Sequence, residues 1–142
     1  MKNKRRHSGQ SLVEFALIFP IAFFLITGFF DLGRAVFYYS SLNNAVREAT
    51  RYAIVHKTDL TNASITPTNN SLQDKVMEYA FGMSLNRAKI YVLVPKDVNN
   101  FFTTVSIRAI YLYQPITPGI KALFGSINIT ARSKMLVTPG SR

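Results

Sequence analysis

The side chains of this sequence that could carry out chemistry are few, and most of them stand alone. The two histidines, His7 and His56, are far apart, and there is no cysteine, so neither a histidine metal pair nor thiol chemistry is expected. Asp74 and Glu78 share a helix face, a spacing more typical of solvated carboxylates than of paired catalytic ones. Phosphate-binding loops and the usual metalloprotease and serine-hydrolase motifs are absent. We therefore predict no enzyme, no metal site, no cofactor and no small-molecule substrate.

One carboxylate, that of Glu14, stands out by its surroundings. It lies at the start of an apolar run that extends from Phe15 to Phe30 and is interrupted only by Pro20, Thr27 and Gly28. As a helix, residues 12–30 would be about 28 Å long, close to the ~30 Å hydrocarbon core of a bilayer. A basic leader precedes the run, with its cations at Lys2, Lys4, Arg5 and Arg6. This pattern predicts a transmembrane helix with a carboxylate near its start.

Two interpretations of Glu14 are open. An acidic side chain at the centre of a span costs roughly 2.5–3.5 kcal/mol on insertion scales, and less near the edge, so Glu14 could be an interfacial residue tolerated by snorkelling or partial protonation. The other interpretation gives it a cationic partner. Cleavage of the Gly9–Gln10 bond would create an α-ammonium group one helical turn before the carboxylate.

The residues around Glu14 resemble a known family. A basic leader, a glycine and then Glu14-Phe15 resemble the cleavage region of type IV pilin precursors. A longer pattern resembles the TadE-like family, the minor pseudopilins of the tight-adherence (Flp pilus) secretion system. It covers roughly the first 53 residues, in the stretches Gly9 to Pro20, Asp31 to Ala35 and Asn44 to Ala53.

The resemblance implies how the N-terminal segment works. It implies cleavage after Gly9 by a prepilin peptidase, with Gln10 as the new N-terminus. It also implies that Glu14 and Phe15 serve assembly and register. The partners would be other pilin subunits and the pilus assembly machinery, and the location would be the bacterial inner membrane or the pilus. Asp31 and Arg34 are spaced for an ion pair at the outer membrane boundary, where subunit packing and membrane anchoring are both open roles.

The charge distribution predicts the topology. The chain carries a formal charge of +10, and four of its 17 basic residues precede the span. Such an N-terminal excess keeps the leader in the cytoplasm and exports the rest. A removable signal peptide is the alternative, but the apolar run is longer than such peptides need, and the sequence after it is a poor cleavage site. No basic run with interleaved aromatic residues occurs in the exported part, so no nucleic-acid partner is expected.

The rest of the chain predicts an α+β fold. Spacings of four and three alternate along one helix stripe, which consists of Ala35, Tyr39, Leu42, Val46, Ala49 and Ala53. This stripe predicts that the helix continues beyond the membrane, and Pro20 predicts a kink in it. A second helix should begin near Ser71 and end before Gly82. Strands are predicted at 89–94, 103–113 and 127–137, with at most one helical turn at 120–124.

These elements predict a type IV pilin-like architecture, in which the long helix packs on a small antiparallel sheet. We divide the chain into a basic leader (1–9), a transmembrane helix (10–33), its aqueous continuation (34–55) and an exported α+β head (56–142).

Two functions from different classes fit this sequence. The first is a minor pseudopilin-like structural and assembly protein of a tight-adherence pilus, which acts by helix–helix packing. The alternative is a bitopic, membrane-anchored extracytoplasmic domain that binds, for instance, an anionic envelope polymer and has no pilus role. The two differ in whether the chain is cut after Gly9.

Overall fold

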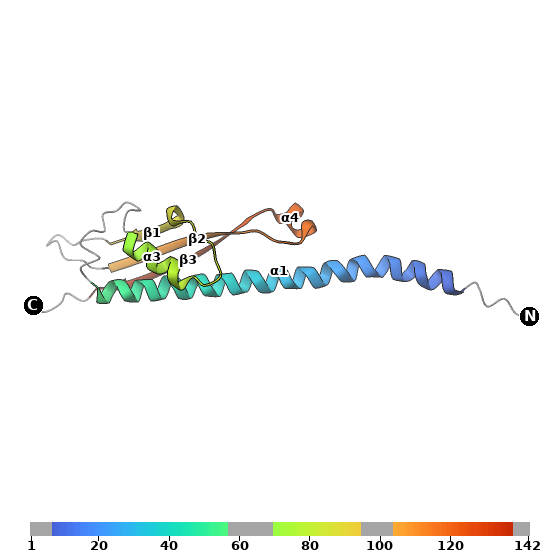
Figure 1. Ribbon diagram of the computed structural model, residues 1–142, viewed down its shortest axis with the longest axis horizontal. Helices are drawn as coiled ribbons and strands as arrows, with labels where there is room; N and C mark the ends of the chain where they lie inside the picture. The colour runs from blue at the N-terminus through green and yellow to red at the C-terminus, as the bar shows by residue number, and fades with distance from the viewer. Residues whose placement is uncertain (1–6, 57–69, 95–103, 138–142) are drawn as a thin grey trace, which may run out of the picture. The chain divides into compact units, whose positions relative to one another are not determined.

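The computed structural model describes residues 7–56, 70–94 and 104–137, and it has the predicted α+β fold (Figure 1). A long helix comes first, and a second helix and a three-stranded antiparallel sheet of order β1-β2-β3 follow it. The elements are α1 (His7–Val55), α3 (Asn70–Tyr79), the 3₁₀ turn η1 (Arg87–Lys89), β1 (Ile90–Leu93), β2 (Thr104–Tyr113), α4 (Pro118–Phe124) and β3 (Ile127–Leu136). Residues 1–6, 57–69, 95–103 and 138–142 lie outside the described residues, and with them the four leader cations and the first residue of the strand predicted at 103–113.

The chain divides into two compact units, each with its own packing. The first consists of residues 1–35 together with 114–126, and the second of residues 36–113 together with 127–142. The segment between β2 and β3, which includes α4, therefore packs with the N-terminal part of α1.

The core of the second unit lies along the C-terminal half of α1, which α3 and the sheet flank in Figure 1. The predicted stripe is confirmed at Leu42, Val46, Ala49 and Ala53, all with no exposed surface. The stripe fails at Tyr39, which is 56% exposed. Its neighbour Tyr38 faces inward instead, because a helix turns about 100° per residue and the rings of β2 lie on that side. The Tyr38 ring centroid is 5.3 Å from that of Tyr111 and 5.9 Å from that of Tyr113.

The sheet alternates in part as its sequence predicts. On β2, the side chains of Val105, Ile107 and Ala109 are fully buried, whereas Arg108 is exposed. Ser106, on the same face as Arg108, is buried as well, at 5% exposure. The register sets Ile107 opposite Val92 of β1 and Ser133 of β3, so one face of all three strands joins the core.

Helix α3 covers the first strand. Leu72 and Val76 are buried, and the equally buried Gln73 donates its side-chain amide to the Ile90 carbonyl oxygen at 2.9 Å. This hydrogen bond joins α3 to β1. Gly82, with φ +74°, follows the helix in the left-handed conformation that favours glycine.

Helix α4 is longer than predicted. The sequence predicts at most one turn from Ile120, whereas the helix has 7 residues and begins at Pro118. Proline fits the first turn of a helix because its missing N–H would have no partner there. Gly125, with φ +62°, follows the last helical residue.

Candidate functional site

The N-terminal part of α1 carries the residues that the sequence singles out for processing and assembly. The helix begins at His7, so the Gly9–Gln10 bond lies inside its first turns. A Cβ atom added at Gly9 would meet nothing within 4 Å, and its backbone is not in the left-handed region. Neither packing nor backbone conformation within the fold therefore requires a glycine at this position.

Glu14 is exposed and sits on the same face as the predicted cleavage site. It lines a shallow hollow on the helix together with Gly9, Gln10, Val13 and Leu17. Within the described part of the chain, its carboxylate has no ion-pair partner. The four leader cations, Lys2, Lys4, Arg5 and Arg6, lie outside the described residues. The carboxylate is thus accessible to a group from outside the fold.

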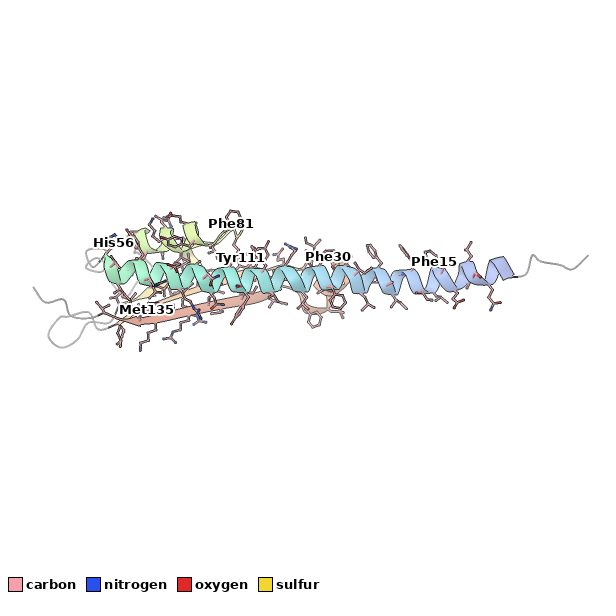
Figure 2. All side chains as sticks on the ribbon, turned by 90° about the horizontal axis from the view of Figure 1, so that it is seen from below. Phe15, Phe30, His56, Phe81, Tyr111 and Met135 are labelled. Atoms are coloured by element: carbon pink, nitrogen blue, oxygen red, sulfur yellow. The ribbon has the colours of Figure 1, made fainter. Side chains whose placement is uncertain are left out.

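Large apolar side chains surround Glu14 and cover every side of this half of the helix. Phe15, Phe19 and Phe23 form a ladder one turn apart, with successive ring centroids 5.5 and 6.2 Å apart. Figure 2 shows Phe15 and Phe30 projecting from the ribbon, and these side chains are 64% and 71% exposed. The helix runs on through Pro20.

This half of α1 has the properties of a membrane span. Its best window has a mean hydropathy of 2.2, and none of that window is buried within the fold. A helix that is apolar on all sides needs either a protein core or lipid around it. The length and composition of α1 fit a single-pass membrane protein.

Asp31 and Arg34 lie at the end of the apolar run, where the sequence places a boundary ion pair. The Arg34 Nη1 atom is 3.6 Å from Asp31 Oδ1. Asp31 is only 5% exposed, and its two carboxylate oxygens accept backbone N–H groups: Oδ1 from Ile116 at 3.1 Å and Oδ2 from Thr117 at 2.9 Å. We call this arrangement the Asp31 clamp.

Sequence reasoning missed the partners of the clamp. Asp31 is 85 residues from Ile116, so no local spacing connects them. The available signal was Pro115-Ile116-Thr117-Pro118, where two prolines without N–H groups flank the two donors. A buried carboxylate is one of the few groups that can bind two adjacent N–H groups at once.

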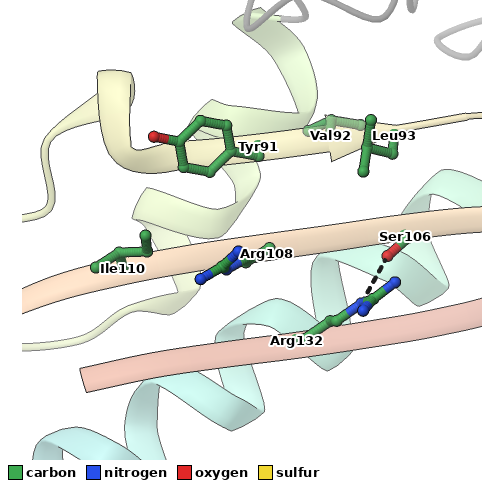
Figure 3. Close-up of a pocket in the computed structure, with 7 residues that line it drawn as sticks. All are labelled: Tyr91, Val92, Leu93, Ser106, Arg108, Ile110 and Arg132. Atoms are coloured by element: carbon green, nitrogen blue, oxygen red, sulfur yellow. Dashed lines mark hydrogen bonds between the residues drawn. The ribbon is translucent and has the colours of Figure 1, made fainter. Parts of the chain in front are cut away.

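A second candidate site lies on the sheet face that bears Arg108. The hollow has a volume of about 330 Å³ and is lined by Tyr91, Val92, Leu93, Ser106, Arg108, Ile110 and Arg132 (Figure 3). Arg108 and Arg132 are directly opposite each other in the β2–β3 register. The Arg132 Nε–H donates to the Ser106 hydroxyl oxygen at 3.3 Å.

The two guanidinium groups make this hollow basic. Among the described residues, neither has a carboxylate within 4 Å. Like charges directly opposite each other in a sheet repel, so an anion between them would relieve this repulsion.

Metal chemistry finds no support in the described ranges. No group of three or more histidine, aspartate or glutamate side chains gathers there as a metal ion would require.

Comparison with known proteins gives a match to a family model. Residues 9–51 match the family model described as TadE-like protein, which confirms the resemblance drawn from the sequence motifs. No curated protein and no solved structure matches the chain. The matched stretch contains Gly9, Glu14 and the Asp31–Arg34 pair, and it ends within the packed half of α1.

Proposed function

We propose that this protein is a minor pseudopilin-like structural and assembly subunit of a tight-adherence (Flp type IV) pilus. It is processed after Gly9 and acts by helix–helix packing. The observation that carries the proposal is the match of residues 9–51 to the TadE-like family. The fold supports it, because a long helix joined to a small α+β head suits a subunit that packs through its helix.

The proposed topology has one membrane span. Residues 10–33 cross the bacterial inner membrane, the leader (1–9) stays in the cytoplasm, and the aqueous helix (34–55) and the head (56–142) are exported. The bare apolar half of α1 supports the span, and the cations of the leader support the orientation. After processing, the chain resides in this membrane or in the pilus.

Gly9 is the proposed recognition point for the prepilin peptidase. A glycine inside a helix costs about 1 kcal/mol relative to alanine. Since neither packing nor backbone conformation requires it here, the fold gives no reason for this glycine, whereas recognition by a peptidase would give one. A residue without a side chain allows a peptidase to approach the chain closely at the membrane surface.

Glu14 then has an assembly role. A carboxylate alone in a bilayer is unfavourable, whereas a carboxylate opposite the new α-ammonium group of a neighbouring subunit forms a charge pair in a medium of low dielectric constant. A shift of one residue rotates a helix side chain by about 100° and moves it about 1.5 Å. The pair would therefore also fix the axial register between packed helices, with Phe15 beside it.

Processing is tested by the mass of the membrane-extracted protein from cells that contain a prepilin peptidase. We expect a mature chain that starts at Gln10, and Gly9→Val should leave the precursor uncut. Gly33→Val is the matched control, because a Cβ atom added at Gly33 also meets nothing within 4 Å. A mature chain that starts at Met1 or Lys2 in such cells would contradict the proposal.

The hollow between Arg108 and Arg132 favours a second candidate function, that of a membrane-anchored domain that binds an anionic envelope polymer. The variant Arg108→Gln/Arg132→Gln should then lose retention on an immobilised acidic polysaccharide, whereas Lys121→Gln, which removes a charge elsewhere, should keep it. Equal retention of the unmodified protein and of both variants would exclude this function for the hollow.

A further inference from the structure

The segment between β2 and β3, residues 114–126, presents large apolar side chains that the fold leaves uncovered. We call it the α4 segment. Ile116, Leu123 and Phe124 are 70%, 80% and 68% exposed. Exposed apolar groups gathered in so short a segment indicate an interaction surface.

Contacts within the first unit show which residues of α1 lie beside α4. A Cβ atom added at Gly119 would lie 3.4 Å from Phe24 Cε1, and one added at Gly28 would lie 3.5 Å from Ile120 Cδ1. Helix α4 is thus beside residues 24–28, inside the apolar run. Phe24 is about 10 Å before Asp31 along the helix axis, at about 1.5 Å per residue.

This position makes lipid the partner. The turns of α1 that α4 touches belong to the proposed span, so a membrane that surrounds them also reaches α4. Phe29 and Phe30, each 71% exposed, add apolar surface on other sides of the same stretch of α1. The exposed Lys121 supplies a cation whose long stem could reach from this depth to the lipid phosphates.

Several polar backbone groups of the α4 segment are paired within the protein, which lowers the cost of entering a bilayer. Pro115 and Pro118 have no N–H group, and the two N–H groups between them bind Asp31. Further along, the Lys121 N–H donates to the Thr117 carbonyl oxygen at 2.9 Å, and the Gly125 N–H donates to the Lys121 carbonyl oxygen at 2.9 Å.

We propose that the α4 segment is a second membrane contact, which inserts Ile116, Leu123 and Phe124 into the lipid leaflet on the exported side, beside α1. The Asp31 clamp favours this insertion by pairing the two N–H groups between Pro115 and Pro118. The inference rests on the membrane span in the proposed function, and it adds a lipid-binding surface in the exported sequence.

The test uses the absence of cysteine from the sequence, which allows single-cysteine variants of the full chain. Leu123→Cys is labelled with an environment-sensitive fluorophore, and the purified protein is placed at low density in phosphatidylcholine–phosphatidylglycerol vesicles with or without spin-labelled lipid. Leu25→Cys, at 61% exposure within the apolar run, reports on the span. Leu136→Cys on β3 is the matched control, because Leu136 is as exposed as Leu123, at 77% against 80%.

We expect spin-labelled lipid to quench the label at Leu123 severalfold more than the label at Leu136, and to nearly the same extent as the label at Leu25. Quenching at Leu25 with none at Leu123 would overturn this inference and leave the proposed function intact. Quenching at neither position would overturn the membrane span on which both rest. If the label at Leu123 escapes lipid only when protein density rises, a second copy is the partner and the lipid assignment is wrong.

Discussion

The two halves of α1 belong to one continuous helix, but the fold leaves the apolar side chains of the first half exposed and buries those of the second. In the first half, large side chains such as Leu12 and Phe30 are each 71% exposed, whereas in the second half Leu42 and Val46 have no exposed surface. The second half is amphipathic and packs within its own unit. The first half is apolar on every side, and no protein layer of comparable size covers it in the described chain, so its stability depends on its surroundings. One helix therefore joins a part that folds against protein to a part that needs lipid or other helices.

The comparison predicts that the same substitution has different effects in the two halves, and this difference should be the largest. Leu42→Ala removes a fully buried side chain and should destabilise the head by about 2–5 kcal/mol. Leu25→Ala, at a position that is 61% exposed, should leave the stability of the head unchanged. Both are measured by chemical denaturation of the full chain in detergent micelles, followed by tyrosine fluorescence. Equal losses would mean that the two halves do not differ as described.

The Asp31 clamp should give the next largest effect. Asp31→Ala removes two hydrogen bonds to a charged acceptor, each worth about 1.5–3 kcal/mol. The Ile116 and Thr117 amides should then exchange their hydrogens about 10- to 100-fold faster, because a factor of ten corresponds to about 1.4 kcal/mol.

Glu48→Ala is the control for the clamp, since Glu48 pairs with Arg51 on an exposed helix face. It should leave the exchange of both amides unchanged. Unchanged exchange in Asp31→Ala as well would show that the carboxylate does not hold the α4 segment.

The ion pair on α3 should give the smallest effect. The hydrogen bond from Lys75 to Glu78 raises the pKa of Lys75 above its usual 10.5. A raised pKa in the folded state stabilises the fold below the unfolded value, and this contribution is lost as the pH rises through the folded pKa. In denaturation at increasing alkaline pH, Glu78→Gln should show a slightly shallower loss of stability than the unmodified chain. Because Lys75 is half-exposed and Glu78 exposed, a large difference between the two would contradict a simple surface pair.

Much of the fold could be predicted from local patterns. The spacing of Leu42, Val46 and Ala49 fixes the packed face of α1, and period-two alternation fixes the buried face of β2. Local patterns do not predict which of two neighbouring aromatic side chains faces the core, as at Tyr38 and Tyr39. They also underestimate the length of α4, because its helix begins at a proline that the sequence treats as a break.

The candidate sites divide in the same way. Glu14 is visible from the sequence because a charge within an apolar run is unusual, and Gly9 because it stands at a fixed distance before that charge. The pairing of Asp31 with Ile116 and Thr117 could not be predicted, because it joins backbone groups that are far away in the chain. The position of Arg108 opposite Arg132 depends on strand register, which alternation alone does not give.

The most direct test of the account is whether Glu14 is needed for assembly. Glu14→Gln should be inserted and cleaved normally, because it makes the span more apolar and leaves Gly9 unchanged. It should be lost from the sheared pilus fraction and from cross-links to partner pilins, whereas Glu48→Gln, on the aqueous part of the same helix, should be incorporated normally. If Glu14→Gln assembles as well as the unmodified protein, Glu14 is only a tolerated interfacial residue, and the proposed pairing in the pilus is wrong.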